Sequence, residues 1–489
     1  GVCPGLVRAP CLSACPVGVN VPGFVSLVGE KRYAEALRLH RERNPFASVC
    51  ARVCFHTCED KCRRASLDEP VSIRGVKRYM VDQEVTVQVP EVREDPANAK
   101  RKIAVIGAGP AGLSCAYFLA RLGYRPDVLE SEPRPGGMLV QAIPAYRLPR
   151  EELAREVRMI EHLGVSIETG RTLGHDFTLK ELREKGYEAV FLAVGAPLGV
   201  PLDLPGAHAH GVTEAMSFLR QYNIRGSVPV GKRVAVIGGG NAAIDAARTA
   251  IRLGAQSVTV IYRRTREEMP AYAEEIEEAL QEGVTLRTLV HPEAFEVEDG
   301  RVTGVRLRAM KLGEFDRSGR RRPEGADDAA CEVLPADQVI VAIGQALDKK
   351  VLAGADEVER TGSGWVKADP RTGATSLPWL FAGGDVVSGP SSVADAIAAG
   401  ERAAVAIDEK LTGKEHAFWR GYSDPGTAFD AFADPVTYAR EKLHTMPLER
   451  RRQNFAEVEQ PWNEATAVRQ AKRCLRCDYG KQPCECEHA

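Results

Sequence analysis

The stretch that decides the fold of this chain is Ile103-Ala-Val-Ile-Gly107-Ala-Gly109-Pro110-Ala111-Gly112. Its first four residues are apolar without a break, as in a strand that is buried on both faces of a parallel sheet. The three glycines permit a tight turn, let backbone approach a ligand, and bring a helix against the strand. Apolar spacing from Pro110 to Leu122 predicts that helix, ending at Gly123. The stretch therefore predicts a βα unit that binds a dinucleotide pyrophosphate at the helix N-terminus.

An acidic residue stands where such a unit needs one. The next expected strand, 126–129, is followed by Glu130, close to the expected distance of about twenty residues after the glycines. A carboxylate at this position can accept hydrogen bonds from the hydroxyls of an adenosine ribose. Because strand, glycines, helix and acid occur together, the prediction is stronger than the glycine pattern alone would allow.

A second copy of the pattern begins at Val234 and reads Val-Ala-Val-Ile-Gly238-Gly-Gly240-Asn241-Ala242-Ala243. Alanine in place of the third glycine is a permitted variant of the fingerprint. The position equivalent to Glu130 is Ile261, and Arg263 and Arg264 follow it. Two guanidinium groups there suit the 2′-phosphate of NADP(H). A solvated arginine pair beside an NADH site is the alternative interpretation.

The order of further strands predicts how the two units are connected. Strand-like runs at 189–194 and 338–343 lead to Gly195 and Gly344, and a last run at 379–382 leads into Gly383-Gly384-Asp385. Asp385 at a strand end can bind a ribityl hydroxyl of a flavin, and the following helix can face the flavin ring. We therefore expect the last strand to close the first unit around the second.

The predicted fold class is α/β. We expect two Rossmann-like dinucleotide-binding domains, for FAD and NAD(P)H, with the second inserted in the first, an N-terminal α-helical iron-sulfur domain and a helical C-terminal extension. The expected boundaries are 1–99 for the iron-sulfur domain, 100–228 and 346–412 for the two parts of the FAD domain, 229–345 for the NAD(P)H domain, and 413–489 for the extension.

The cysteines point to metal binding. Only Cys115 and Cys331 of the 13 cysteines lie away from the two ends of the chain, and we expect both to be small core side chains. A disulfide scaffold would spread its bridges through a short fold. A four-iron cluster takes four thiolates, and iron-sulfur ligation is favoured over zinc or inert thiols. The cysteines near the ends are Cys3, Cys11, Cys15, Cys50, Cys54, Cys58, Cys62, Cys474, Cys477, Cys484 and Cys486.

Composition excludes several classes of protein. The chain has 489 residues, of which 44% are hydrophobic and 27% are charged, values typical of a folded enzyme with several domains. A formal charge of -2 gives no field that would attract nucleic acid or an anionic membrane, so we expect neither as a partner. No apolar run is long enough to span a bilayer and no signal pattern is evident, so a cytoplasmic location is expected.

Together, these motifs resemble one family. Beyond the motifs above, the resemblance rests on Gly136-Gly137-Met138, on Ile143-Pro-Ala-Tyr-Arg147-Leu-Pro and on Tyr262-Arg-Arg-Thr-Arg-Glu-Glu-Met-Pro270. Residues from about 10 to 410 resemble the glutamate synthase small (β) subunit family, which includes the N-terminal part of dihydropyrimidine dehydrogenase and the large subunit of ferredoxin:NADP(H) transhydrogenase. The resemblance implies FAD on the first unit, NADPH on the second, and two [4Fe-4S] clusters. The nucleotide-binding residues expected on these grounds are Gly107, Gly109, Pro110, Ala111, Gly112, Glu130, Gly137, Met138, Arg147, Gly195, Gly238, Gly240, Asn241, Ala242, Asp245, Arg263, Arg264, Gly344, Gly384 and Asp385.

The same resemblance implies how the cysteines divide. It places Cys11 and Cys62 on one cluster, and Cys15, Cys54 and Cys58 on the other. Two departures stand out: only Cys3 precedes Cys11 where the family has a Cys-x-x-Cys pair, and Lys77 stands where relatives have a Gln or Glu ligand. Cys50 or a different carboxylate can take the place of that missing ligand.

The C-terminal pair Cys474 and Cys477 can supply what the N-terminus lacks. The pair follows an arginine, as it commonly does near the N-terminus of relatives, so we expect it to fold back and complete the first cluster. A separate tail cluster that adds Cys484 and Cys486, or a zinc site with His488, are the alternatives. The expected metal ligands are Cys11, Cys15, Cys50, Cys54, Cys58, Cys62, Cys474 and Cys477, giving two clusters, or three if the tail forms its own.

The predicted function is electron transfer by an FAD- and iron-sulfur-dependent NAD(P)H oxidoreductase subunit. Nicotinamide exchanges hydride with the flavin, the flavin divides the electron pair, and the clusters carry single electrons to or from a partner redox subunit, so no side chain is expected to be catalytic. A module of a ferredoxin-, aldehyde-, formate- or hydrogen-oxidising complex is the alternative to a glutamate synthase subunit. A disulfide reductase is disfavoured because the flavin region has no Cys-x-x-Cys.

Overall fold

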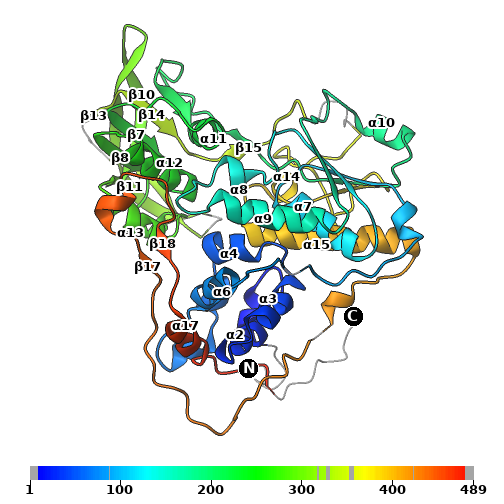
Figure 1. The fold of residues 1–489 in the computed structure, drawn as a ribbon. Helices are drawn as coiled ribbons and strands as arrows, with labels where there is room; N and C mark the ends of the chain where they lie inside the picture. Colours follow the sequence, from blue (N-terminus) through cyan, green and yellow to red (C-terminus); the bar gives the residue numbers. More distant parts are fainter. Residues whose placement is uncertain are drawn as a thin grey trace.

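The chain forms two parallel sheets with a group of helices beneath them (Figure 1). The structure is a computed structural model that describes residues 9–87, 89–316, 319–326, 331–351, 357–421 and 423–479. Cys3, Cys484, Cys486 and His488 lie outside these residues, and with them the predictions of a separate tail cluster and of a tail zinc site.

The first sheet has five parallel strands in the order β16-β4-β1-β2-β3. Its central strands β1 and β4 are buried along their whole length, as their unbroken apolar sequences predict. The strands are β1 (Ile103–Ile106), β2 (Asp127–Glu130), β3 (Ser166–Thr169), β4 (Ala189–Leu192) and β16 (Leu380–Ala382).

The second sheet has five parallel strands in the order β6-β14-β7-β8-β9. All of them fall between β4 and β16 in the sequence, so the second unit is inserted into the first and the predicted fold class is confirmed. The strands are β6 (Val212–Glu214), β7 (Arg233–Ile237), β8 (Ser257–Tyr262), β9 (Thr285–Thr288) and β14 (Gln338–Val341).

Helices flank each sheet, and smaller sheets extend the second unit. The predicted βα helices are α7 (Pro110–Arg121) in the first unit and α12 (Asn241–Arg252) in the second. The others are α8 (Met138–Gln141), α9 (Arg150–Glu161), α10 (Leu179–Glu184), α11 (Ala215–Arg225), α13 (Ala273–Gln281), α14 (Asp385–Ser388) and α15 (Val393–Thr412). An antiparallel sheet contains β10 (Val290–Glu298), β11 (Arg301–Phe315), β12 (Arg321–Gly325) and β13 (Glu332–Pro335), and β5 (Leu198–Gly199) pairs with β15 (Gln345–Ala346).

Six short helices build the N-terminal region. The apolar spacing between Val21 and Leu39 forms two helices, because the chain turns at Lys31, whose φ is 62°. Figure 1 shows these helices below α9 and α15 of the first unit. The helices are α1 (Pro10–Ala14), α2 (Val21–Gly29), α3 (Tyr33–Arg41), α4 (Ala47–Val53), α5 (Thr57–Asp60) and α6 (Ile73–Asp82).

The extension after α15 returns to the N-terminal helices. It contains two helices, α16 (Leu448–Arg451) and α17 (Glu464–Ala471), and a strand pair, β17 (His444–Thr445) with β18 (Glu459–Gln460), joined by extended chain. Figure 1 shows this segment, orange to red, reaching α17 beside α2. Among the described helices, none is long and apolar enough to cross a membrane.

Candidate functional site

The first cavity has a volume of about 490 Å³ and lies where the first sheet's strands end. It brings together most of the residues predicted to bind FAD, while Gly112 packs behind the turn against the Gly107 carbonyl. Three residues predicted for the second unit, Asn241, Ala242 and Asp245, also line it. The predicted residues of the first unit on its wall are Gly107, Gly109, Pro110, Ala111, Glu130, Gly137, Met138, Arg147, Gly195, Gly384 and Asp385.

The glycine turn has the shape of a cradle for a pyrophosphate. Gly107 has a φ of 102°, and a Cβ there would lie 2.5 Å from the Ala193 carbonyl oxygen. Gly137 has a φ of 53°, and a Cβ there would lie 2.8 Å from the Gly109 Cα. Side chains are therefore excluded from both walls of the turn, and the N-terminus of α7 faces the open space between them. Backbone amides and a helix dipole at such a place fit a dinucleotide.

The carboxylate of Glu130 holds the turn in place. Its Oε2 accepts a hydrogen bond from the Ala108 N–H at 2.6 Å, and its Oε1 accepts one from the Glu132 N–H at 2.8 Å. Burial raises the pKa of this carboxyl group. Since each carboxylate oxygen has two lone pairs, Glu130 keeps acceptor capacity for a ribose hydroxyl in the cavity that it lines.

Asp385 closes the opposite side of the cavity at the start of α14. Its Oδ1 accepts hydrogen bonds from the Ser391 N–H at 3.1 Å and from the Ser391 hydroxyl at 2.9 Å. Burial raises the pKa of its carboxyl group. The next helix, α15, begins after Ser392 with a capping box, so a second helix N-terminus faces the same space.

A second cavity, of about 550 Å³, lies at the ends of the second sheet's strands. The predicted Gly238, Gly240, Arg263, Arg264 and Gly344 line it. The residues that line both cavities are Met216, Asn241, Ala242, Gln345 and Ser391. The two cavities therefore meet, and a ligand in one can contact a ligand in the other.

The two arginines after β8 have different surroundings. Arg263 is exposed at the cavity, whereas Arg264 is buried. The Nη2 of Arg264 lies 2.9 Å from the Asp316 Oδ2, and its Nε donates to the Arg321 carbonyl at 2.6 Å. Arg264 thus joins the loop after β8 to β12, a role that the sequence did not predict. Arg320 also lines this cavity, and the arginine run 320–322 was the signal that sequence reasoning overlooked.

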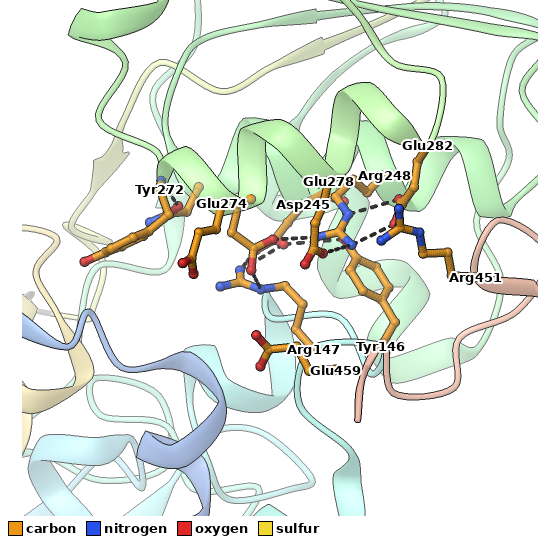
Figure 2. A network of polar contacts seen from close by, with 12 residues as sticks. Tyr146, Arg147, Asp245, Arg248, Tyr272, Glu274, Glu278, Glu282, Arg451 and Glu459 are labelled. Carbon is orange, nitrogen blue, oxygen red and sulfur yellow. Dashed lines mark hydrogen bonds and ion pairs between the residues drawn. The ribbon is translucent and has the colours of Figure 1, made fainter. Parts of the chain in front are cut away.

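Arg147 and Asp245, both predicted at the nucleotide sites, pair with each other across the two units. The Nη1 of Arg147 lies 3.0 Å and 2.8 Å from the two Asp245 oxygens, and its Nε lies 2.9 Å from Glu275. Figure 2 shows this pair at one end of a polar network between the two units. Because Asp245 lies on α12 and Glu275 on α13, Arg147 fixes both helices relative to the first unit.

The rest of that network consists of buried ion pairs. Arg248 lies 2.5 Å from Glu275, 2.7 Å from Glu278 and 2.7 Å from Glu282, and its guanidinium carbon lies 4.8 Å from the centre of the Tyr146 ring. The extension joins it from the other side through Arg451, whose Nε lies 3.8 Å from the Glu282 Oε1 (Figure 2). The Nη2 of Arg451 also donates to Gln281 at 2.7 Å. The two nucleotide units and the extension are therefore tied together beside the first cavity.

One group of cysteines joins the two ends of the chain. Cys11, Cys62, Cys474 and Cys477 line one small cavity between α1, α2 and the chain after α17. Burial and then the neighbouring Cys474, Cys62 and Cys477 raise the pKa of Cys11, and burial raises the pKa of Cys474 to about 12. These are the four residues expected to share the first cluster, and four thiols around one space fit a [4Fe-4S] cluster.

The tail is held at this place by a buried arginine. Arg473 has no exposed surface. Its Nη2 lies 2.9 Å from the Asp68 Oδ1, and its Nη1 donates to the Pro70 carbonyl at 3.1 Å. Glu459 of β18 pairs with Arg74 of α6 at 2.5 Å. The extension is thus anchored on the N-terminal region at two places before the cysteine pair.

A second group of cysteines lines a cavity of about 230 Å³. Cys15, Cys50, Cys54 and Cys58 lie around it together with Lys77. The His56 N–H donates a hydrogen bond to the Cys54 sulfur at 3.4 Å. Hydrogen bonds to the ligand sulfurs are one factor that sets the reduction potential of a cluster. Within the part of the chain that is described, no three His, Cys, Asp or Glu side chains converge on a point as ligands of a single ion do; a four-iron cluster separates its ligands more widely.

One residue that the sequence analysis missed connects these sites. Phe55 lines both the first cavity and the cavity of the second cysteine group, as does Ser392. The Phe55 carbonyl accepts a hydrogen bond from the Tyr272 hydroxyl at 3.2 Å. The only signal in the sequence was its place directly after Cys54. A single layer of side chains therefore separates the first cavity from the second cysteine group.

The two remaining cysteines differ from each other. Cys115 is buried in α7, as expected. Cys331 is exposed, so the prediction that it is a core residue is wrong. Its sulfur lies 3.1 Å from the Glu293 Oε2 beside the exposed strand β13.

Fold and cavities define a class: an oxidoreductase with two nucleotide sites and an iron-sulfur domain. Residues 101–400 match the pyridine nucleotide-disulphide oxidoreductase family, and residues 3–89 match the family described as dihydropyrimidine dehydrogenase domain II, 4Fe-4S cluster. The chain belongs to the pyridine nucleotide-disulphide oxidoreductase family. FAD, NAD(P)H and [4Fe-4S] clusters are its cofactors, and the predicted class of enzyme is confirmed.

Proteins similar in sequence confirm the resemblance to the glutamate synthase small subunit. The chain is 40% identical to NADP(+)-dependent formate dehydrogenase subunit beta of Moorella thermoacetica, over 96% of this chain and 71% of that protein. It is 35% identical to NADPH-Fe(3+) oxidoreductase subunit beta of Geobacter sulfurreducens, over 96% and 75%. It is 36% identical to the glutamate synthase [NADPH] small chain of Escherichia coli, over 81% and 87%.

Among solved structures, FprA of Mycobacterium tuberculosis in complex with NADPH has a similar fold. The TM-score is 0.56 at 20% identity, over 64% of this chain and 85% of that one. This similarity supports the architecture of the nucleotide-binding part alone.

Proposed function

We propose that the chain takes electrons from NADPH and passes them through two iron-sulfur clusters to a partner redox subunit. The observation that carries the proposal is the continuity of the sites: the nicotinamide cavity meets the flavin cavity at Asn241 and Gln345, and the flavin cavity meets the second cysteine group at Phe55 and Ser392. When bound, FAD supplies the conversion of a hydride into two single electrons, and each cluster carries one of them.

The chain's own residues bind and orient these groups. Amides of the turn at Gly107 and of the α7 N-terminus would hold the FAD pyrophosphate, Glu130 its ribose, and Asp385 its ribityl chain. The buried Arg147–Asp245 pair sets the position of α12 at the junction of the cavities. Cys15, Cys50, Cys54 and Cys58 would hold the cluster nearer the flavin, and Cys11, Cys62, Cys474 and Cys477 the cluster farther from it.

NADPH is favoured over NADH as the nucleotide. Arg263 is exposed at the cavity and Arg320 also lines it, and guanidinium groups bind phosphate strongly. The three relatives described above carry NADP or NADPH in their names. A cytoplasmic location is part of the proposal, supported by the absence of disulfides among the described cysteines.

The extension favours one kind of partner. The formate dehydrogenase and Fe(3+) oxidoreductase subunits match 96% of this chain, whereas the glutamate synthase small chain matches 81%. The extension, which supplies half of one cysteine group, fits the longer matches. We therefore propose that the chain is the nicotinamide module of a formate-oxidising or metal-reducing type of complex, in preference to a glutamate synthase subunit.

Anaerobic purification followed by titration with NADPH tests the proposal. We expect one FAD and about eight iron atoms per chain, flavin bleaching, and electron paramagnetic resonance (EPR) signals of reduced clusters. Dithionite reduction of the same sample is the control that shows the full cluster signal. Two results would contradict the proposal. One is zinc in place of iron, and the other is clusters that dithionite reduces but that NADPH and the reduced flavin do not.

A further inference from the structure

A positive charge is buried among the thiols of the second cysteine group. Lys77 on α6 is only 7% exposed and lines the cavity with Cys15, Cys50, Cys54 and Cys58. Its ammonium group interacts electrostatically with all four thiols. Among the residues that the structure describes, no carboxylate forms an ion pair with it. A buried lysine is unfavourable unless negative charge lies beside it, so the surroundings of Lys77 are completed by an anionic group in the cavity.

Lys77 is not a ligand itself, because a protonated amine has no lone pair to offer iron. Cys50 on α4 lines the same cavity and is 1% exposed. The His40 ring also lines the cavity, and its Nδ1 is buried without a partner. Thiolate is the usual ligand of such clusters, so Cys50 is the better candidate.

We propose that the second cluster is held by Cys15, Cys50, Cys54 and Cys58, and that Lys77 is a counter-cation that raises the cluster's reduction potential without ligating it. The inference rests on the proposed function, because it requires a four-iron cluster in this cavity. Reduction adds one electron and one negative charge and moves no proton, so an adjacent ammonium stabilises the reduced form. This cavity and the flavin cavity share Phe55 and Ser392 in their walls. A higher reduction potential of the second cluster therefore favours electron transfer from the flavin to that cluster.

The ligand is tested with Cys50→Ala in the full, FAD-loaded chain, purified without oxygen. We expect loss of about four of eight iron atoms, or conversion to a three-iron cluster with an EPR signal in the oxidised protein, with FAD retained. Cys115→Ala, a buried cysteine away from the cavity, is the matched control and should keep all its iron. Two unaltered four-iron clusters in Cys50→Ala would overturn the assignment. If His40→Asn then loses a cluster, His40 is the ligand in place of Cys50. A wild-type chain without iron would instead refute the proposed function.

The role of Lys77 is tested by potentiometric titration of each cluster's EPR signal. Lys77→Met should keep its iron and FAD, while the ratio of reduced to oxidised second cluster at a fixed potential falls at least about tenfold, which corresponds to about 59 mV. Lys77→Arg, which keeps the charge, should stay near the wild-type value, and the first cluster should not change in either variant. An unchanged potential in Lys77→Met, or loss of the second cluster's iron as complete as in Cys50→Ala, would overturn the counter-cation role.

Discussion

Arg147 Nη1 lies 2.8 Å from Asp245 Oδ2, and this buried ion pair joins the two nucleotide-binding units. Arg147 precedes α9 of the first unit, and Asp245 lies in the first turns of α12 of the second. Both line the flavin cavity. Their contact therefore positions the N-terminus of α12, and with it Asn241, relative to the flavin site.

We predict that Arg147→Gln is more damaging than Asp245→Asn. Removing the arginine leaves the buried Asp245 without its ion-pair partner, although Glu275 keeps Arg248, whereas removing the aspartate leaves Arg147 beside Glu275. Breaking a buried pair costs roughly 3 to 5 kcal/mol when a charge remains uncompensated. We expect a loss of that size for Arg147→Gln in denaturant unfolding of the FAD-loaded protein, together with flavin reduction by NADPH that is slowed at least about tenfold.

An exposed pair provides the control for this prediction. Lys367 and Glu359 lie 2.8 Å apart at the surface, and Lys367→Gln should change stability by less than about 1 kcal/mol. Equal losses in Arg147→Gln and Asp245→Asn would contradict the proposed asymmetry. Unchanged flavin reduction in both would show that the pair does not position α12.

The two arginines after β8 should separate nucleotide recognition from stability. Arg263→Gln should weaken NADPH binding about tenfold or more and leave NADH unaffected, because one charged hydrogen bond to phosphate contributes about 1.5 to 3 kcal/mol. Arg264→Gln should lower stability and affect both nucleotides alike, since this guanidinium binds Asp316 and the Arg321 carbonyl. Kinetics with NADPH and NADH for each variant measure the difference. If Arg264→Gln no longer discriminates between NADPH and NADH while Arg263→Gln still does, the roles of the two arginines are reversed.

Glu156 predicts a pH dependence of stability. Its carboxyl group is fully buried on α9 and accepts hydrogen bonds from the Ser48 N–H at 2.5 Å and the Val49 N–H at 3.1 Å, at the start of α4. Burial raises its pKa to about 7. An acid with a raised folded-state pKa contributes stability that is complete below its unfolded pKa of about 4.3 and is lost as the pH rises through 7.

Glu156→Gln removes this dependence while keeping the shape of the side chain. Relative to that variant, the wild-type protein should lose about 1.4 kcal/mol between pH 6 and pH 8, as follows from 1.36 kcal/mol per pKa unit. Denaturant unfolding at several pH values measures the effect. Glu161→Gln, exposed on the same helix, should follow the wild-type profile. Parallel profiles for wild type and Glu156→Gln would contradict the prediction.

The βα units could be predicted because their signals are local. An apolar run, a glycine turn and a helix with apolar spacing each follow from burial and backbone sterics within about twenty residues, and the structure has β1, α7, β7 and α12 where they are expected. The insertion of the second unit followed from the order of the strands. The class of cofactors followed in the same way.

Partners that are far apart in the sequence could not be predicted. Nothing near Arg264 indicates that Asp316 would bind it, and nothing near Arg147 indicates that Asp245 would. Both arginines were expected to face a nucleotide, because an arginine in a binding motif has the same sequence signature whether it meets phosphate or carboxylate. Cys474 and Cys477 were placed near Cys11 by a different argument, the count of thiols that a cluster needs.

The tail cysteines lead to the last prediction. Cys474→Ala or Cys477→Ala should remove about four of eight iron atoms and leave FAD and the second cluster in place, because each variant takes one of four thiols from the cavity that Cys11 and Cys62 also line. Cys331→Ala, an exposed cysteine elsewhere, should keep all its iron.

A double variant separates this arrangement from a cluster made by the tail alone. A tail cluster would need Cys484 and Cys486, so Cys484→Ala/Cys486→Ala should retain about eight iron atoms if Cys11 and Cys62 complete the site instead. Deleting residues 470–489 should remove the same four iron atoms and also uncover the face of the N-terminal helices on which Arg473 is buried. Iron content and the EPR spectrum of the reduced protein measure all three outcomes. A first cluster that survives in Cys474→Ala, or that is lost in Cys484→Ala/Cys486→Ala, would show that the tail does not close the site as the structure places it.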